Sequence, residues 1–562
     1  MTTTLDRGDS TCALKPGSWR CGGLMMRYVL GYLVLCSSLG ACSGGAAEVP
    51  VVPALADVAR DDASKVHPGG LDVTASDANQ LDTAATLDGV QPDAAGEDTA
   101  SKDVIDENPG DGVQGDVSGG IAGCAASPTF GYAPGKSVFG HKAWIQFIPG
   151  ELPIIFSAPH GGYLKPAEIK DRVTGLKNAD SYTLETTLLV AAALFRATGK
   201  WPHVVLNRLH RSKLDANREI VEAAQGDELA EQAWGEFHKF IDVAKAEVAA
   251  RCGRGLYIDM HANAHASKWT EFGYRLTTAQ LNKDDSALNT AALIALSSMR
   301  ALVSQQPTKL PLGWTKPSHA KVLRSATSLG GRLQAVGFKS VPSPAHPGPG
   351  TAAYFRGGYN TARHGSQKGG SIDGVQIETY TKFIATSAAG RLAYSDNLAK
   401  VIHGFVTDTY GWPLGEKISA PSHATCAQAM PLTWSPSSSG KLSVSDNTVA
   451  ATNEFGKQVT CGGALAVDGP QLYYTLTLKA GVTYRFRLMT SFPTRLYLFE
   501  DTCTPAAISA SCKANGLAAP LIKTGEDKSF TIKIKKGGLW RIAVDSVSDA
   551  WLGHFQLNID VP

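Results

Sequence analysis

The sequence predicts two folded parts: an α/β domain with a mixed central sheet flanked by helices, and an all-β sandwich after it. From about residue 134 to residue 412, short apolar runs that end in polar residues alternate with long helical stretches, which is typical of an α/β domain. After residue 413, short alternating segments are separated by Gly and Pro, as in a small β-sandwich. With 562 residues, of which 43% are hydrophobic and 19% charged, the chain can bury both cores.

The N-terminus is expected to direct export. Residues 28–39 form an apolar run that follows Arg27 and ends in Leu-Gly-Ala-Cys, which is typical of a secretory signal and too short to span a bilayer. The four residues resemble the bacterial lipobox, which implies a lipid on Cys42; the alternative is an ordinary cleavage site. Met25 or Met26 is then a candidate start. We expect a lipoprotein signal peptide over residues 1–42 and a bacterial protein on the outer membrane or cell surface.

Residues 43–123 are expected to be a disordered linker. This stretch is rich in Ala and Asp, and between residues 43 and 120 it holds 16 acidic and 3 basic residues, so it cannot bury a core and repels itself. Residues 121–562 hold 46 basic and 33 acidic residues, which favours anionic substrates. Lys/Arg clusters interleaved with aromatic residues are missing from the sequence, so we expect no nucleic-acid partner.

Six cysteines follow Cys42, an even number that is compatible with disulfides in an exported chain. Spacing makes Cys503 with Cys512, and Cys426 with Cys461, plausible pairs, although it does not fix the connectivity. No C-x-x-C motif suggests a cysteine metal site.

Within residues 124–412 the pattern predicts four strands and two long helices. The strands are expected at residues 154–156, 203–207, 255–261 and 374–379, and the helices at 182–198 and 228–252. In an open α/β sheet the active site lies at the carboxyl ends of the strands. Within residues 413–562, strands are expected at 472–478, 483–488, 495–499 and 540–544.

Two histidines and one glutamate follow predicted strands. His160 precedes two glycines, so its ring can project into a cleft, and His261 ends the strand that contains Asp259. Histidines of this kind bind metals, with an acidic neighbour orienting the ring. Glu378 ends another apolar strand, where it could act as the general base.

The run from His210 to Glu219 contains basic and amide groups that suit a carboxylate ligand. A solvated charged loop is the alternative interpretation of this run.

Together these motifs resemble the N-formylglutamate amidohydrolase family, within the zinc carboxypeptidase-like folds. The matching stretches, in the family's order, are Ser-Ala-Pro-His-Gly-Gly, Leu-Asp-Ala-Asn-Arg, Ile-Asp-Met-His and Val-Gln-Ile-Glu, and the resemblance covers residues 140–412. It implies a zinc-exopeptidase-like sheet and Zn²⁺ held by His160 and His261. It also implies that Glu378 is the catalytic base and that Asn217 and Arg218 bind the substrate carboxylate, helped by Arg211.

One metal ligand departs from the carboxypeptidase pattern. A Glu is expected three residues after the first His, where this sequence has Tyr163. Asp180 is the first choice for the missing carboxylate, followed by Glu185 and Glu168. His265 is a candidate for lining the pocket, and either Tyr359 or His364 a candidate donor to the oxyanion.

The resemblance implies hydrolysis of the amide bond of a small acidic N-acyl amino acid or peptide, by a metal-dependent hydrolase acting on carbon–nitrogen bonds other than peptide bonds. Export favours a zinc carboxypeptidase, or a hydrolase of γ-glutamyl or cell-wall peptides. A non-catalytic surface binding protein is the alternative from another class. Residues 413–562 resemble the pre-peptidase C-terminal type of β-sandwich in texture.

Overall fold

The computed structural model describes residues 20–21, 24–25, 124–125, 131–305, 314–434, 440–461, 465–466, 469–490, 492–515, 527–547 and 552–561. The chain divides into two units, Met1–Thr74 and Ala75–Pro562. In the first, β1 (Arg20–Cys21) pairs antiparallel with β2 (Leu24–Met25). The apolar run 28–39, Cys42 and the linker 43–123 lie outside the described residues.

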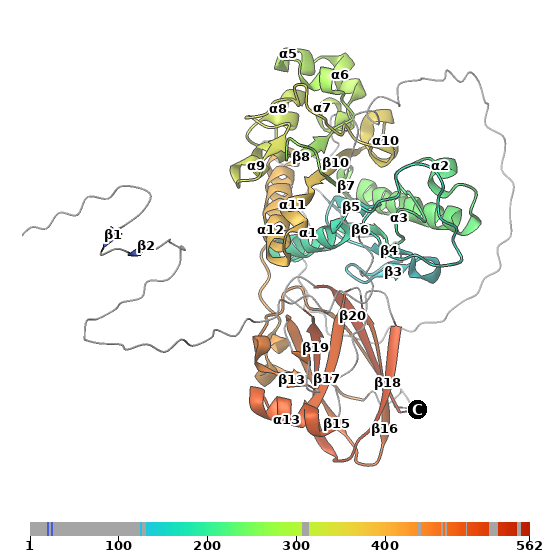
Figure 1. Cartoon of the computed structure of the whole chain (residues 1–562), viewed down its shortest axis with the longest axis vertical. Helices are drawn as coiled ribbons and strands as arrows, with labels where there is room; N and C mark the ends of the chain where they lie inside the picture. Colours follow the sequence, from blue (N-terminus) through green and yellow to red (C-terminus); the bar gives the residue numbers. More distant parts are fainter. Residues whose placement is uncertain are drawn as a thin grey trace, which may run out of the picture. The chain divides into compact units, whose positions relative to one another are not determined.

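The α/β part of the second unit is built on an eight-stranded mixed sheet (Figure 1) in the order β3-β4-β6-β5-β7-β10-β8-β9. Its centre is parallel, because β5 pairs with both β6 and β7, and β7 pairs with β10. The strands are β3 (Val138–Phe139), β4 (Ile145–Ile148), β5 (Ile154–Ala158), β6 (His203–Asn207), β7 (Gly255–Asn263), β8 (Thr270–Gly273), β9 (Ser340–Val341) and β10 (Ile372–Tyr380). The four predicted strands are β5, β6, β7 and β10.

Helices cover both faces of this sheet. Since successive strand residues point to opposite sides, each strand contributes apolar side chains to both cores. On one face, Phe156 and Ile258 share a core with α1 (Thr183–Thr198) and α12 (Ala388–Phe405), which pack against each other. On the other face, Ile155 and Tyr257 pack with α3 (Glu228–Cys252). The two predicted helices are α1 and α3. Both stop at glycines in the left-handed conformation, Gly199 and Gly253, which ends a helix without steric cost.

Short helices fill the connection from β8 to β9, where the sequence predicted no element. They are α4 (Thr278–Leu281), α5 (Asp285–Leu288), α6 (Ala291–Leu296), α7 (Arg300–Ser304), α8 (His319–Arg324) and α9 (Leu329–Ala335). Three more short helices lie elsewhere in the α/β part: α2 (Ile220–Ala224), α10 (Tyr359–His364) and α11 (Thr381–Ala385).

The C-terminal part contains two four-stranded sheets, in the orders β11-β15-β19-β17 and β12-β20-β16-β18. Alternate residues of β16, including Tyr484 and Phe486, are buried and share one core with residues of the other sheet, as in a sandwich. The elements are β11 (Met430–Pro431), β12 (Lys441–Asn447), β13 (Thr460–Cys461), β14 (Leu465–Ala466), β15 (Gln471–Leu478), β16 (Thr483–Thr490), β17 (Thr494–Glu500), α13 (Pro505–Asn515), β18 (Asp527–Lys533), β19 (Gly538–Ser546) and β20 (His554–Asp560).

Disulfides link Cys124 to Cys252 and Cys426 to Cys503. The second bond makes both suggested pairings wrong, because Cys426 and Cys503 bond to each other; Cys512 is disulfide-bonded as well. Sequence spacing misled because the pairing depends on how the strands and α13 pack. Disulfides are typical of an oxidising, extracellular compartment. Within the described ranges, every helix is too short or too polar to cross a bilayer.

Candidate metal centre

Three parallel strands bring the predicted site residues to one edge of the sheet. His160 follows β5, His261 lies near the end of β7, and Glu378 lies near the end of β10. Because β5, β7 and β10 are neighbours with parallel pairing, their carboxyl ends meet at this edge.

Two glycines hold His160 close to the rest of the site. A Cβ added at Gly161 would lie 2.5 Å from the Leu184 amide nitrogen, and one at Gly162 would lie 2.3 Å from the Arg208 carbonyl carbon. Since real Cβ atoms do not approach backbone that closely, only glycine fits at these positions. The loop after β5 is therefore packed between the start of α1 and the segment after β6.

Asp180 is tied to the same loop through its backbone. Its amide donates to the His160 carbonyl at 3.1 Å. The Thr183 hydroxyl donates to the Asp180 carbonyl at 2.9 Å, at the first turn of α1. These bonds direct the Asp180 carboxylate toward the edge of the sheet.

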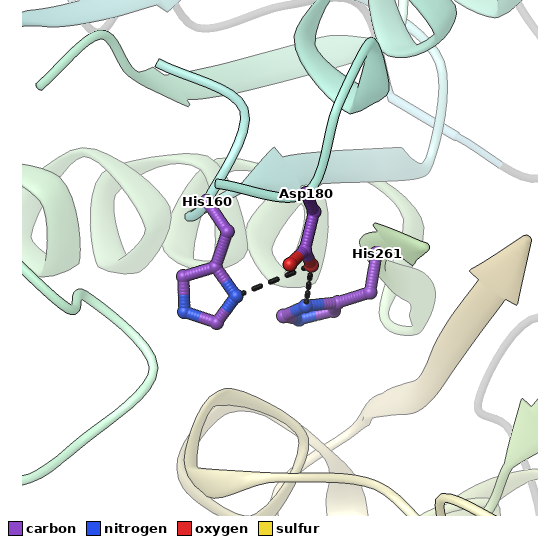
Figure 2. A group of neighbouring side chains, drawn as sticks. All are labelled: His160, Asp180 and His261. Atoms are coloured by element: carbon purple, nitrogen blue, oxygen red, sulfur yellow. Dashed lines mark hydrogen bonds and ion pairs between the residues drawn. The ribbon is translucent and has the colours of Figure 1, made fainter. Parts of the chain in front are cut away.

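Figure 2 shows His160, Asp180 and His261 converging, each with one ligand atom within 4.8 Å of the others. Asp180 Oδ2 lies 3.3 Å from His160 Nδ1 and 3.1 Å from His261 Nδ1. Two imidazoles and a carboxylate facing one another are a donor set that could hold a metal ion. Asp180 is thus the carboxylate that lies beside both histidines, whereas Glu185 and Glu168, the other candidates, do not belong to this group.

A second carboxylate holds the far side of each imidazole ring. Asp215 Oδ1 lies 2.6 Å from His160 Nε2, and Asp259 Oδ2 lies 2.9 Å from His261 Nε2. Carboxylates in this position fix the tautomer and the ring orientation of a ligating histidine. Both rings therefore present Nδ1 to Asp180.

Arg211 links two of these carboxylates. Its Nε donates to Asp215 Oδ2 at 2.9 Å, and its Nη1 lies 3.5 Å from Asp180 Oδ1. The buried Arg172 lies 3.8 Å from Asp215 Oδ2 and donates to the Arg211 carbonyl. The two guanidinium groups balance the carboxylate charge, so Arg211 is engaged in the site's framework.

Burial and charge oppose each other at this centre. Burial disfavours the ionised form of Asp180, but His160 and His261 outweigh it and hold the pKa of that carboxyl well below its usual range. Burial likewise disfavours charge on His261, but Asp259 and Asp180 outweigh it and raise the pKa of the ring. The side chains thus stabilise anionic carboxylates around a point that attracts a cation.

The two residues expected to bind a substrate carboxylate have other partners. Asn217 is buried; its Oδ1 accepts from the Asn360 amide at 2.8 Å and its Nδ2 lies 3.4 Å from His261 Nε2. Arg218 is partly exposed and donates to Glu222 at 3.0 Å. Asn217 therefore adjoins the metal group, which consists of His160, Asp180 and His261. Arg218 instead forms an ion pair at the surface.

Glu378 is the direct neighbour of His261 across the pairing of β10 with β7. It is buried, and its Oε1 accepts from Gln376 Nε2 at 2.7 Å. Burial raises the pKa of Glu378 to about 8; the Asp180 charge acts in the same direction and His261 opposes it. The carboxyl group adjoins the metal group.

The other candidate residues lie in different surroundings. Glu168 pairs with Lys142 on the surface at 2.9 Å, and Glu185 is buried on α1, where it hydrogen-bonds Tyr163. Arg363 donates to the Tyr359 hydroxyl at 3.0 Å. His364 lies against α3, 2.9 Å from His238, so the structure does not bring it to the metal group.

The loop at residues 354–360 is hydrogen-bonded to three polar side chains at this edge. The Phe355 amide donates to Glu271 Oε2 at 2.8 Å, and the Gly358 amide donates to Gln376 Oε1 at 2.6 Å. The third bond is the one from Asn360 to Asn217. This loop therefore forms one wall of the site.

Sequence reasoning assigned no role to Asp215 or Glu271. Asp215 lies in the Leu-Asp-Ala-Asn-Arg stretch that carried the family resemblance, so the signal was available. Glu271 lies on β8, a short strand that the pattern did not reveal. Its position became apparent only from the pairing of β8 with β10.

No family model and no curated protein matches the chain. Among solved structures, the chain is similar to gene product Atu2144 from Agrobacterium tumefaciens, with 13% identity and a TM-score of 0.28 over 48% of this chain and 97% of that one. It is similar to the pre-peptidase C-terminal domain of collagenase from Bacillus anthracis, with 12% identity and a TM-score of 0.14 over 25% and 100% of the two chains. It is also similar to PliG, a periplasmic inhibitor of g-type lysozyme from Aeromonas hydrophila, with 12% identity and a TM-score of 0.16 over 24% of this chain and 96% of that one. These values assign no family.

Proposed function

We propose that the chain is a zinc-dependent amidohydrolase that cleaves the amide bond of an N-acyl amino acid, with N-formylglutamate as the model substrate, or of a related peptide. The observation that carries the proposal is the His160, Asp180 and His261 group with Glu378 beside it. Two histidines and one carboxylate form the protein part of many catalytic zinc sites and leave a position open. The carboxylates on the far ring nitrogens add the outer support that such sites have.

Zinc bound by these three residues would supply Lewis acidity for the substrate carbonyl and for the attacking water. Glu378 takes the proton of that water, for which its carboxyl group must be ionised. Arg211 and Arg172 hold Asp215 and, through it, the His160 ring. Gln376 donates to Glu378 and keeps its carboxyl group at the end of β10.

Substrate binding by Arg218 requires it to exchange partners. Its ion pair with Glu222 is solvent-exposed, and pairs of this kind contribute at most about 1 kcal/mol. We propose that a substrate carboxylate replaces Glu222 at Arg218, next to Asn217. The zinc-exopeptidase-like character of the sheet belongs to the same proposal.

Exposed apolar side chains favour a peptide as a second candidate substrate. Tyr163 is 54% exposed and follows the His160 loop, and Phe355 is 42% exposed on the 354–360 loop. Exposed aromatic side chains beside a polar site are suited to binding apolar groups of a larger substrate. A carboxypeptidase-like or γ-glutamyl or cell-wall peptide hydrolase is therefore the alternative within this class.

The experiment measures zinc content and hydrolysis in the wild type, His261→Ala and Glu378→Gln. N-formyl-L-glutamate, N-acetyl-L-glutamate, γ-glutamyl dipeptides and cell-wall peptides are the substrates. We expect about one zinc per wild-type chain, loss of zinc in His261→Ala, and retained zinc without activity in Glu378→Gln. A wild type that binds no zinc when it is offered would overturn the proposal and favour a non-catalytic surface binding protein.

Export and anchoring are part of the proposal. The disulfides fit an exported chain, and the lipobox-like Leu-Gly-Ala-Cys suggests lipidation at Cys42. We propose a lipoprotein of the outer membrane or cell surface, with residues 43–123 as a linker, 124–412 as the catalytic domain and 413–562 as a pre-peptidase-like sandwich. Radiolabelled palmitate should label the wild type in a bacterial host, whereas Cys42→Ala should remain unlabelled.

A further inference from the structure

The polar site continues along the sheet beyond Glu378. His261, Glu378 and Glu271 are direct register partners on β7, β10 and β8, so their side chains project from the same face of the sheet. At the usual strand spacing, Glu271 lies two strands, or about 10 Å, from His261 at the backbone. This distance is similar to the length of a substrate amide with its flanking groups.

Glu271 holds an imidazole at this second position. It is fully buried, and its Oε1 lies 2.8 Å from His265 Nδ1 while its Oε2 accepts from the Phe355 amide. An ionised carboxylate can only accept hydrogen bonds, so Nδ1 is the nitrogen that carries a hydrogen. Phe355 stacks on the His265 ring with centroids 4.6 Å apart and an angle of 24°. Hydrogen bonding and stacking together fix the ring.

The other ring nitrogen of His265, Nε2, is open to a bound substrate. Within the described residues no side chain or backbone group hydrogen-bonds Nε2, and the side chain is 15% exposed. By contrast, the buried His238 of α3 and His364 of α10 lie against each other. An imidazole that a carboxylate orients, with no hydrogen-bond partner at its second nitrogen, is suited to exchange a proton with a bound substrate.

We propose that His265 is a second catalytic residue, a general acid that protonates the leaving nitrogen of the substrate, and that Glu271 is its positioning residue. The role rests on the proposed amide hydrolysis. Glu378 takes one proton from the attacking water as the new carbon–oxygen bond forms. His265 enters this step as the imidazolium, with hydrogen on Nδ1 toward Glu271 and on Nε2. Its Nε2 proton passes to the substrate nitrogen as the carbon–nitrogen bond breaks, which releases an amine and a carboxylic acid and leaves a neutral ring with hydrogen on Nδ1. The proton on Glu378 passes to His265 and restores both groups.

The test compares His265→Gln with the wild type on two leaving groups. The substrates are the amide that the wild type hydrolyses and the 4-nitrophenyl ester of the same acyl group, whose leaving oxygen departs without a proton. We expect His265→Gln to lose about 100-fold in kcat/KM on the amide and only a few-fold on the ester, with zinc content unchanged. His346→Gln is the matched control, because His346 contacts Trp269 through its ring and should behave as the wild type.

A readout without substrate accompanies the kinetics. In metal-free full-length protein labelled with ¹⁵N-histidine, the His265 signals, identified by their loss in His265→Gln, should report hydrogen on Nδ1 when the ring is neutral. Hydrogen on Nε2 alone would overturn the proposed orientation. If His265→Gln lost kcat/KM equally on the amide and the ester, or on neither, the general-acid role would be overturned. The proposed function would then still be tested by Glu378→Gln. A zinc-loaded wild type that cleaves neither substrate would overturn both.

Discussion

Each histidine of the metal group lies between two carboxylates. Asp180 is at Nδ1 of both rings, and Nε2 faces Asp215 in His160 and Asp259 in His261. At the scale of the residue, this arrangement separates the donor atoms from the groups that aim them. Asp215 and Asp259 hold the rings without belonging to the His160, Asp180 and His261 group that could hold a metal ion. Their contribution should therefore be visible in metal affinity even when the fold is intact.

Asp215→Asn should weaken metal binding by about 10- to 100-fold, because the ring of His160 loses its charged partner. Zinc titration of the full chain against a chelating indicator measures the change. Asp171→Asn is the matched control, since Asp171 pairs with Lys213 and is exposed. Equal affinities for Asp215→Asn and the wild type would show that Asp215 does not support the metal group.

A buried carboxyl group away from the site makes stability depend on pH. Burial raises the pKa of Asp373 to about 6, even though Ser366 and Tyr410 donate to it. Because its pKa in the folded chain exceeds the unfolded value, the unfolded chain ionises first as pH rises. The contribution of Asp373 to the free energy of unfolding therefore falls between about pH 4 and pH 6, and this loss is complete above that range.

Asp373→Asn should remove this dependence. The free energy of unfolding of the wild type is expected to fall by about 2 to 3 kcal/mol relative to the variant between pH 4 and pH 7. Urea unfolding at the two pH values measures the difference. A wild-type-minus-variant difference that stays constant across this range would contradict the prediction.

At the scale of the element, the 354–360 loop connects the strand ends to the metal group. Its amides bond to Glu271, Gln376 and Asn217, so the loop and three site residues hold one another in place. Gly358 approaches Asn217 so closely that an added Cβ would lie 2.6 Å from Nδ2. A methyl group there would displace Asn217 or the loop.

Gly358→Ala should destabilise the chain by about 1 to 3 kcal/mol, a typical cost of overpacking, and should weaken zinc binding. Gly235→Ala is the control, because Gly235 lies within α3 with nothing within 4 Å of an added Cβ. It should stabilise the helix by up to about 1 kcal/mol. Urea unfolding measures the stability of both variants, and zinc titration measures their affinity for zinc. A Gly358→Ala protein as stable as Gly235→Ala would contradict the packing argument.

The sequence revealed elements whose residues have a regular pattern. The apolar run before Glu378 and the run through Ile258 mark β10 and β7, and the helical pattern predicts both ends of α3. Short elements were missed, since α4–α9 are each four to seven residues long, too short for a periodic pattern. Within the site, the approach of Asp180 to both histidines depended on the loop before α1, which no local pattern encodes.

At the scale of the whole molecule, covalent links join distant parts of the chain. The Cys124–Cys252 bond spans 128 residues and the Cys426–Cys503 bond spans 77. Loop-closure entropy grows slowly with length, so this difference alone is worth only about 0.5 kcal/mol. Each bond should contribute a similar amount to its own part of the chain.

Replacing Cys124 and Cys252 by serine should lower the free energy of unfolding by about 3 to 5 kcal/mol. Calorimetry of the double variant should show a lower thermal midpoint than the wild type under oxidising conditions. In the presence of reductant the two proteins should become similar. An unchanged midpoint of the double variant in the absence of reductant would show that the bond contributes little.

The first of these bonds also determines how mechanical force enters the protein. Tension applied to the chain before Cys124 crosses directly through sulfur to Cys252 at the end of α3, and the backbone between them carries none of it. His160, Asp180 and Asp215 all lie within that shielded stretch. Stretching a tether on the N-terminal side would therefore load the chain after Cys252, beginning with β7, while the segment that supplies His160 and Asp180 to the candidate metal group stays relaxed.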